Sequence, residues 1–330
     1  MPDGQSLANS LAPLLQATCR HRLGNINWFR ATWQHSGAGT GFSTWTFPDG
    51  REIPCVVKLP VGHREYHWTK RLGLVDPRDW DSPESLALPT PRVLAAGYDL
   101  GDYDLAWVII EKLRNPPIAS EMNEGVMWEL FETAAEFQSA AILEESVIDA
   151  SKEHTTHDWA GLIEKGLVSV RKHEIDHEAR WVGLLERTQQ DLDGLVARWR
   201  GRPMNTWCHH DLHARNVMRR LGGESGSRGR CVLIDLAMVG PGCWIEDALY
   251  LERLFWGQED GLFGMDPLGT LASTRQAIGL PVGDDDLALA DVRRVLMAAS
   301  SPAFLRTEGD PSYLNGAIEV LDRLLPSVIG

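Results

Sequence analysis

Two stretches of this chain of 330 residues contain the polar residues that best indicate its fold: HHDLHARN, residues 209–216, and the later run VLID, which ends at Asp235. Asp211 and Asn216 are five residues apart, and Asp235 follows Asn216 by nineteen residues. Short apolar runs precede both groups of polar residues. Polar residues in loops between short strands are a common position for catalytic groups. These two stretches are therefore the candidate site.

Asp211, Asn216 and Asp235 offer the groups that phosphoryl transfer requires. That reaction needs an acceptor for the proton of the attacking hydroxyl group, and oxygen ligands for magnesium. Asp211 can accept the proton. The amide of Asn216 and the carboxylate of Asp235 suit Mg²⁺, which prefers hard oxygen ligands and takes its other ligands from phosphate groups and water.

Two other interpretations of residues 209–216 remain open at this point. Three histidines and an aspartate close together could bind zinc or manganese in a hydrolase. The same polar groups could also form a purely structural loop, satisfied by hydrogen bonds in the core. The hydrolase interpretation leaves Asn216, Asp235 and Lys58 without a role.

The first third of the chain predicts a small antiparallel sheet that carries one helix. Between Asn25 and Leu59 the apolar runs NWFRATWQ, FSTWTF and EIPCVVKL are separated by SGAGTG and by the turn signal PDG at 48–50. A helix is expected over 63–73, and a hairpin over 94–113. The leucine spacing between Ser6 and Cys19 predicts a further short packing helix.

The rest of the chain predicts a mainly helical region that begins after the run RNPP. The candidate stretch is a β-rich interruption of this region, from Thr206 to Leu236. We expect an α+β fold with an N-terminal domain of residues 1–113 and a C-terminal domain of residues 114–330. The amphipathic helical patterns cover 121–145, 158–172 and 178–200.

HHDLHARN and the strand with IDL resemble the catalytic loop HGDLHxxN and the magnesium-binding strand of the aminoglycoside phosphotransferase and choline kinase families. These families share the protein-kinase-like fold, with an antiparallel-sheet N-lobe and a mainly helical C-lobe. The resemblance implies that Asp211 is the catalytic base and that Asn216 and Asp235 bind Mg²⁺. It also implies that His209 supports the loop, and that Asp247 in GPGCWIEDAL ties the loop to the following helix.

A kinase of this fold needs a lysine on its third strand, which neutralises the α- and β-phosphates and is held by a glutamate from the adjacent helix. Lys58 in IPCVVKL fits this role, because a charge at the end of an apolar strand is costly unless an anion meets it. Glu65 is the expected partner. Glu84 is the alternative, since seven residues between Lys58 and Glu65 is a short separation.

Two further segments complete the expected nucleotide site between the lobes. SGAGTG, one hairpin before Lys58, offers flexible backbone N–H groups that could cover a triphosphate. By the resemblance, the strand AWVIIEKL reaches the hinge between the lobes, where its last residues would hold the base. The expected nucleotide-binding residues of these segments are Ser36, Gly37, Gly39, Gly41, Glu111 and Leu113.

Some positions depart from the family pattern without removing a required oxygen atom or charge. His210 stands where a small residue is usual, Arg215 where glycine is common, and Leu236 where an aromatic residue is frequent. Arg215 is expected in a surface salt bridge, although it could reach a phosphate or a substrate carboxylate. The resemblance spans about residues 25–255. Beyond it, the run GDDD at 283–286 is expected to cap the helix that follows, although it resembles an acidic patch for an aminocyclitol.

Composition limits the partners and the compartment. With 46 acidic against 32 basic residues, the formal charge of −14 disfavours nucleic acid and suits a cationic or neutral small substrate. The five cysteines are widely spread and are interpreted as reduced packing residues. The sequence contains neither a basic leader nor a run of about 18 apolar residues, so we expect a cytoplasmic protein that does not enter a membrane.

We therefore expect a small-molecule kinase that uses Mg²⁺ to move the γ-phosphate of ATP or GTP to a hydroxyl group of a small substrate. It would act as a monomer or a homodimer, and the sequence does not specify the acceptor. The alternatives are a non-catalytic nucleotide-binding scaffold of the same fold and, further from the pattern, a His/Asp metallohydrolase. Every polar group that the family uses is present, which argues against a degenerate pseudokinase.

Overall fold

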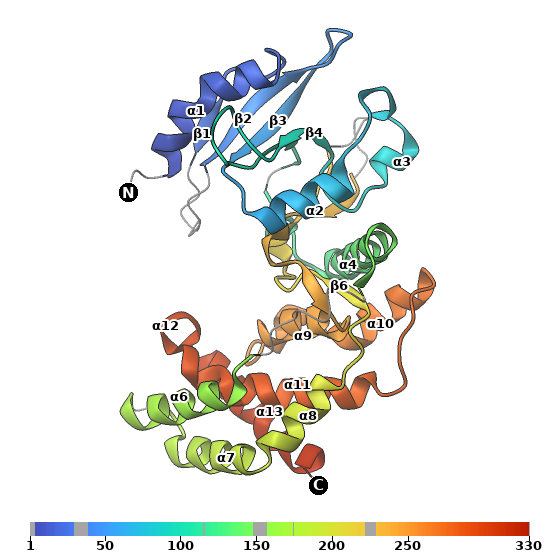
Figure 1. Ribbon diagram of the computed structural model, residues 1–330. Coiled ribbons are helices and arrows are strands. Elements are labelled where there is room, and N and C mark those ends of the chain that lie inside the picture. Colours follow the sequence, from blue (N-terminus) through green and yellow to red (C-terminus); the bar gives the residue numbers. More distant parts are fainter. Residues whose placement is uncertain are drawn as a thin grey trace. The chain divides into compact units, whose positions relative to one another are not determined.

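The computed structural model separates the chain into two compact units (Figure 1). Unit 1 consists of Met1–Met122, Ser139–Glu144 and His213–Val239, and unit 2 consists of Asn123–Gln138, Glu145–Leu212 and Gly240–Gly330. The residues described are 4–29, 39–114, 116–147, 157–173, 175–221 and 229–329. Both units draw on segments that are far apart in the sequence, and the single domain boundary expected after residue 113 stays a prediction.

Unit 1 is built on an antiparallel sheet of five strands in the order β1-β2-β3-β5-β4 (Figure 1). The longest pairing joins β2 to β3, from Gly39 opposite Leu59 to Thr46 opposite Glu52, on either side of the PDG turn. The antiparallel N-terminal sheet expected from the sequence is confirmed. Its strands are β1 Asn27–Phe29, β2 Gly39–Thr46, β3 Glu52–Leu59, β4 Val93–Gly97 and β5 Trp107–Glu111.

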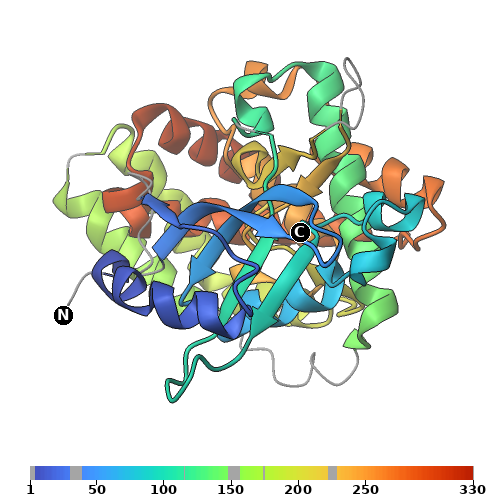
Figure 2. The ribbon, with the colours of Figure 1, turned by 90° about the horizontal axis from the view of Figure 1, so that it is seen from above.

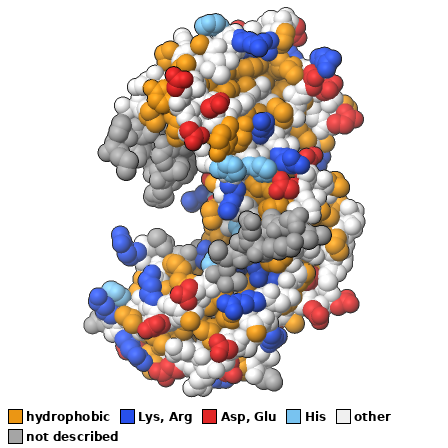
Figure 3. Space-filling model, in the orientation of Figure 1, with side chains coloured by type: hydrophobic (Ala, Val, Ile, Leu, Met, Phe, Trp, Pro, Cys, Tyr) orange, Lys and Arg blue, Asp and Glu red, His pale blue; other side chains and the backbone are white. Residues whose placement is uncertain are grey.

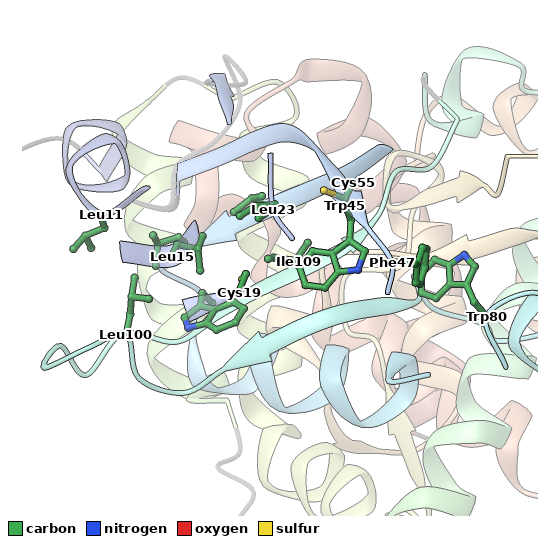
Figure 4. Close-up of a cluster of buried hydrophobic side chains, with 13 residues drawn as sticks. Leu11, Leu15, Cys19, Leu23, Trp45, Phe47, Cys55, Trp80, Leu100 and Ile109 are labelled. Atoms are coloured by element: carbon green, nitrogen blue, oxygen red, sulfur yellow. The ribbon is translucent and has the colours of Figure 1, made fainter. Parts of the chain in front are cut away.

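One face of the sheet is covered by α1, Gly4–Thr18, which is drawn in dark blue beside the strands in Figure 2. Successive side chains of a strand point to opposite faces. Cys55, Val57 and Leu59 of β3 therefore point into the core that α1 covers. Figure 4 shows this core, to which α1 contributes Leu11 and Leu15 and the strands contribute residues such as Trp45 and Ile109. Each large side chain buried there stabilises the fold by about 1.5–3 kcal/mol.

The opposite face of the sheet carries α2, His63–Gly73, whose bounds agree with the sequence-based prediction. A smaller apolar core, formed mainly by β4 and β5, lies on this side of the sheet. Val56 packs against that core. Lys58 stands two residues further along β3, so its side chain leaves the sheet on the same side as Val56, toward α2.

A two-stranded hairpin completes unit 1. Its strands are β7, Val217–Arg219, and β8, Cys231–Leu233, and they pair in antiparallel register. The backbone N–H of Leu233 donates to the carbonyl of Pro89 at 2.8 Å, which joins the hairpin to the segment that precedes β4. The β-rich interruption expected around the candidate stretch is thus present. Its part that contains β7 and β8 belongs to unit 1, together with the five-stranded sheet.

A buried ion cluster fastens the hairpin to the sheet. The carboxylate of Glu111 accepts a hydrogen bond from Arg92 Nη2 at 2.7 Å and another from Arg220 Nε at 2.9 Å. Arg220 also donates to the carbonyls of Leu86 and Thr90, at 2.6 and 2.9 Å. Charges at this depth are tolerated only when they are paired and hydrogen-bonded. The cluster therefore fixes the end of β5 to the residue that follows β7.

Unit 2 is mainly helical, as the sequence predicts. Its most extensive packing between two helices joins α11, Asp286–Ser300, to α13, Pro311–Ile329. The single helix predicted over 178–200 is wrong in one respect, because the chain leaves the helical conformation at Asp191, a residue of low helix propensity. The other helices described in this unit are α6 Trp159–Lys172, α7 Glu178–Gln190, α8 Leu192–Arg200, α9 Ile245–Arg253, α10 Pro267–Ala277 and α12 Leu305–Glu308. The helix α4, Glu124–Glu144, belongs to unit 2 up to Gln138.

The acidic run at 283–286 does not cap α11 as expected. Within the described segment 229–329, Asp285 precedes the helix but makes no side-chain hydrogen bond to its first turn. The carboxylate of Asp286 accepts hydrogen bonds from the N–H of Gly283 and from the indole of Trp244, both at 2.7 Å. The buried indole of Trp244 needs a hydrogen-bond acceptor. It bonds the carboxylate of Asp286, which the sequence pattern predicted to cap the helix.

The cysteines are buried, and the surface carries charges of both signs. All five cysteines lie in the described segments as buried thiols, and burial raises the pKa of Cys19 to about 12. Acidic and basic side chains are interspersed on the face shown in Figure 3. Among the helices described, none combines the length and the apolar character needed to cross a membrane.

Candidate active site

Lys58 of β3 and Glu65, in the first turn of α2, form an ion pair in unit 1. Lys58 Nζ lies 2.5 Å from Glu65 Oε1, and the two side chains are 22% and 13% exposed. Burial lowers the pKa of Lys58, but the charges of Glu65 and of Asp235 outweigh this effect, so the pKa is raised overall. Lys58 therefore stays positively charged at neutral pH. Glu65, rather than Glu84, is its partner, while the role of the pair in nucleotide binding stays a prediction.

A small pocket opens beside this ion pair, within unit 1. Lys58, Glu65 and Asp235 all line it, so the structure brings together three residues that the sequence singled out. Val108 and Ile110 of β5 are among the residues that form its apolar walls. An ammonium group and a carboxylate that share a largely apolar pocket interact more strongly than they would in water.

Asn216 and Asp235 lie at the same end of the β7–β8 hairpin. Asn216 directly precedes β7, and the N–H of Ile234 donates to its carbonyl at 2.9 Å. Asp235 follows Ile234 with a φ of 61°, in the left-handed region that side chains other than glycine seldom adopt. Such strained residues gather at functional sites. The hairpin thus holds an exposed carboxylate close to a buried asparagine.

In unit 2, the loop that follows β6, Thr206–Cys208, is held by Asp247 of α9. The backbone N–H groups of His209 and His210 donate to the Asp247 carboxylate at 3.0 and 2.8 Å. The side-chain amide of Gln138 donates to the same carboxylate at 2.9 Å. Asp247 is completely buried, and a buried carboxylate is stable only with such partners. These bonds tie the loop to α9.

His209 and Asp211 occupy the next positions of this loop. His209 is buried, and its Nδ1 atom accepts the backbone N–H of Asp211 at 3.3 Å. The ring of His209 packs edge-on against Phe137, with ring centroids 5.9 Å apart. Asp211 is half-buried, and its Oδ1 atom accepts a hydrogen bond from the hydroxyl of Tyr250 at 2.5 Å.

His210, which stands where the resembled families have a small residue, fits against a glycine. A Cβ atom on Gly242, at the end of β9, Gly240–Gly242, would lie 2.8 Å from Sγ of Cys208 and 3.1 Å from Nε2 of His210. Burial lowers the pKa of His210, although the nearby Glu246 works against this shift, so the imidazole is neutral at pH 7. The space left by Gly242 therefore accommodates the larger side chain.

The expected phosphate-covering turn SGAGTG lies only partly within the described residues. Ser36 and Gly37 fall outside them. Gly39 and Gly41 lie in β2 rather than in a turn, which corrects that part of the prediction. A Cβ atom on Gly39 would lie 2.5 Å from the Cβ of Ala8 in α1, so close packing is a sufficient reason for this glycine. The nucleotide contacts of this segment stay predictions.

Glu111 and Leu113 lie where β5 ends. The N–H of Glu111 donates to the carbonyl of Arg92 at 2.9 Å, and its side chain belongs to the buried ion cluster, which the sequence did not predict. Leu113 is 5% exposed. The expected contacts of this segment with a nucleotide base stay predictions.

Several residues that bond the candidate groups were not predicted from the sequence, among them Arg92, which pairs with Glu111. Tyr250 bonds Asp211 across 39 positions of sequence, while Gln138 bonds Asp247 and Arg220 bonds Glu111 across 109 positions each. Only Tyr250 leaves a local signal, since it stands three residues after Asp247 and therefore on the same face of a helix.

The comparison with protein families decides the classification. The model of the phosphotransferase enzyme family matches residues 63–277, which is more than half of the chain. The chain belongs to this family. The resemblance found in the sequence is thereby confirmed, and the match includes both the loop with Asp211 and the hairpin with Asn216 and Asp235. Lys58 lies just before the matched residues. No curated protein matches the chain by sequence.

Solved structures show the same fold as this member of the phosphotransferase enzyme family. A microcompartment-associated aminopropanol kinase is 14% identical, with a TM-score of 0.53 over 97% of this chain and 99% of that one. Spectinomycin phosphotransferase, solved with ADP and spectinomycin, is 12% identical, with a TM-score of 0.52 over 96% and 98%. A mutant of aminoglycoside 2′-phosphotransferase IIIa, solved with GDP, is 11% identical, with a TM-score of 0.51 over 99% of each chain. At these identities the likeness concerns the fold, and the fold expected from the sequence is confirmed.

Among the described residues, no group of three histidine, cysteine, aspartate or glutamate side chains stands in position to hold a metal ion. Asn216 and Asp235 offer a different donor set, one amide oxygen and one carboxylate. This set suits magnesium, which needs few protein ligands because water and phosphate oxygens supply the others. The hydrogen bond between Ile234 and Asn216 keeps the two donor segments adjacent. The chemistry of these donors therefore fits a magnesium ion, and its binding here stays a prediction.

Proposed function

We propose that this phosphotransferase is a small-molecule kinase that transfers the γ-phosphate of ATP or GTP to a hydroxyl group of its acceptor. The observation that carries the proposal is the pocket of unit 1, where the ammonium group of Lys58, held by Glu65, stands beside the carboxylate of Asp235. A fixed cation close to an exposed carboxylate suits a triphosphate and its metal ion. Structural relatives solved with ADP or GDP support the nucleotide part of the proposal.

Unit 1 supplies the nucleotide-binding groups in this proposal. Lys58 neutralises the α- and β-phosphates, and Glu65 keeps its ammonium group in place. Asn216 and Asp235 would hold magnesium, which when bound neutralises charge on the β- and γ-phosphate oxygens. The apolar walls of the pocket strengthen the attraction between Lys58 and a phosphate by limiting the access of water.

Unit 2 supplies the group that receives the proton. The carboxylate of Asp211 accepts the proton of the acceptor hydroxyl and orients that hydroxyl for in-line attack. His209 and Asp247 keep the loop in place through the hydrogen bonds to its backbone. Their contribution to the reaction is to hold Asp211 still, because a small displacement of a catalytic group lowers the rate steeply.

The acceptor is a small molecule with at least one hydroxyl group. A formal charge of −14 favours a cationic or neutral acceptor over an anionic one. Relatives of the same fold are named for spectinomycin and for aminopropanol, both of which carry hydroxyl groups. An acceptor that carries amino groups as well as hydroxyl groups therefore comes first in a search.

Two measurements test the proposal in sequence. Calorimetry with ATP and with GTP, each with Mg²⁺, measures nucleotide binding. Aminoglycosides, choline, amino-alcohols, sugars and macrolides are then screened as acceptors by the release of nucleoside diphosphate. We expect acceptor-dependent release by the wild type. The Asp211→Ala variant should lose orders of magnitude in turnover while its nucleotide affinity stays nearly the same.

Three outcomes contradict the proposal or part of it. Equal turnover by Asp211→Ala would refute the assignment of the base. Nucleotide binding without transfer to any acceptor would favour a non-catalytic scaffold. A tightly bound transition metal in the purified protein, found by elemental analysis, would favour a metallohydrolase.

A further inference from the structure

One face of α9 contacts three successive residues of the loop that carries Asp211. Asp247 accepts the backbone N–H groups of His209 and His210. Tyr250 stands three residues later, and its hydroxyl group donates a hydrogen bond to Oδ1 of Asp211 at 2.5 Å. Residues three apart lie on the same face of a helix. The helix therefore holds both the backbone of the loop and the side chain that the loop presents.

Tyr250 can act only as a donor in this contact at ordinary pH. Burial and the neighbouring Asp211 raise its pKa to about 12, against the weaker opposite effect of Arg253. The phenol therefore keeps its proton at neutral pH. The guanidinium group of Arg253 lies 4.9 Å from the centroid of the Tyr250 ring and packs over it. This stacking holds the ring, and with it the direction of the hydroxyl group.

We propose that Tyr250 is a positioning residue for Asp211: its hydroxyl group holds one carboxylate oxygen and so fixes the rotation of the carboxylate that receives the acceptor proton. This inference rests on the proposed function. A carboxylate turns easily about its last bond, and a single strong hydrogen bond to one oxygen removes that freedom. A catalytic group held in one orientation before the reaction loses less free energy in reaching the transition state.

The proton balance of the step assigns different roles to the two residues. As the acceptor oxygen forms its bond to the γ-phosphorus, the bond between that phosphorus and the bridging oxygen of the nucleotide breaks, and the nucleoside diphosphate leaves. The proton of the acceptor hydroxyl passes to Asp211. Tyr250 keeps its own proton throughout, since it donates a hydrogen bond to Asp211 before and after the transfer.

The first test uses Tyr250→Phe, which keeps the ring and its packing under Arg253 but removes the hydroxyl group. The matched control is Tyr313→Phe, because the Tyr313 hydroxyl lies 3.1 Å from Ser301 Oγ, in unit 2, and its ring stacks on Trp256. Turnover is measured with the best acceptor of the screen or, if no compound serves, as hydrolysis of MgATP. We expect Tyr250→Phe to lower kcat by about 10- to 100-fold with the KM for MgATP unchanged. A kcat within twofold of the control would overturn the inference.

The second test needs no acceptor. The tyrosines are replaced by 3-fluorotyrosine, and the fluorine signal of residue 250 is assigned by its absence in Tyr250→Phe. In Asp211→Asn, which removes the charge, the pKa of the residue 250 hydroxyl should fall by about one unit or more, while that of residue 313 stays constant. An unchanged value at residue 250 would show that the hydrogen bond is absent and would overturn the inference.

The two tests separate failure of the inference from failure of the proposed function. If the wild type transfers phosphate and Tyr250→Phe does so at the same rate, only the role of Tyr250 is overturned. A pKa that responds to Asp211→Asn in a protein that transfers no phosphate, even to water, overturns the proposed function, and the catalytic role of Tyr250 with it.

Discussion

The ammonium group of Lys58 and the carboxylate of Glu65 meet at 2.5 Å although only seven positions separate the two residues in the sequence. Lys58 leaves β3 toward the side of α2, and the connection to the first turn of this helix is short. The chain therefore turns back at once, and Glu65 lies over the end of the strand. A pair formed by so local a path is the part of the site that the sequence can indicate most directly.

The variant Glu65→Gln tests whether the ion pair serves the nucleotide. Removal of the carboxylate leaves Lys58 partly buried and without the group that directs its ammonium toward the phosphates. We expect turnover with MgATP to fall by about 100-fold, a typical effect of losing one charge-stabilising group from a transition state. Glu84→Gln is the matched control, because Glu84 is exposed in α3, Pro83–Leu86. An equal loss in both variants would count against the assignment.

The raised pKa of Lys58 predicts how its contribution to stability depends on pH. A group whose pKa rises on folding stabilises the fold fully below its unfolded pKa, about 10.4 for lysine, and loses this contribution as the pH rises through its folded pKa. The difference in free energy of unfolding between the wild type and Lys58→Met should thus be constant from about pH 7 to 9 and change only above that range. Urea denaturation at each pH measures it. A change between pH 7 and 9 would contradict a raised pKa.

The buried ion cluster around Glu111 makes a strong prediction about stability. Glu111→Gln leaves the guanidinium groups of Arg92 and Arg220 buried without their counter-charge. Loss of one partner from such a buried cluster costs about 3–5 kcal/mol. The free energy of unfolding, taken from urea denaturation, should fall by this amount. The control is Glu186→Gln, because the ion pair of Glu186 with Arg171 is more than half exposed and such pairs contribute about 1 kcal/mol or less. Similar losses in both variants would show that the cluster is not a special stabilising feature.

Asp235→Asn tests the proposed metal ligand. The wild type should bind ATP more tightly with Mg²⁺ than with a chelator, and the variant should lose most of this difference, because an amide binds magnesium less strongly than a carboxylate. Calorimetry in the two buffers measures the effect. Asp102→Asn, at an exposed position between β4 and β5, is the control. A magnesium dependence that survives in Asp235→Asn would remove this residue from the metal site.

Much of the fold could be predicted because its elements carry local patterns. The helix α2 was predicted with its observed bounds, since its apolar spacing and its terminal glycine lie within eleven residues. The strands β2 and β3 follow from alternating apolar residues around a PDG turn. The patterns were less reliable where tertiary packing decides the outcome. Gly39 and Gly41 look like turn residues, yet they lie in β2, where α1 packs too closely for a side chain at Gly39.

In the candidate site, too, some residues are indicated by local sequence and others only by tertiary contacts. Asp211, Asn216 and Asp235 are indicated by a short motif, and Lys58 by a charge at the end of an apolar strand. Tyr250 could not be assigned to Asp211 in this way, because the two residues meet only after α9 packs against the loop. The carboxylate of Asp286 likewise pairs with Trp244, across 42 positions of sequence, instead of capping its own helix. Contacts of this kind depend on tertiary structure and leave little trace in local spacing.

Transfer of the terminal phosphate itself can be followed with ATP or GTP that carries heavy oxygen in its γ-phosphate. The nucleotide is incubated with Mg²⁺, the protein and the best acceptor of the screen, and the products are analysed by mass spectrometry. We predict that the wild type delivers the labelled phosphoryl group to the acceptor, and that Asp211→Ala lowers the rate by orders of magnitude. Label found only in inorganic phosphate, or on the acceptor at the same rate in Asp211→Ala, would contradict a kinase in which Asp211 receives the acceptor proton.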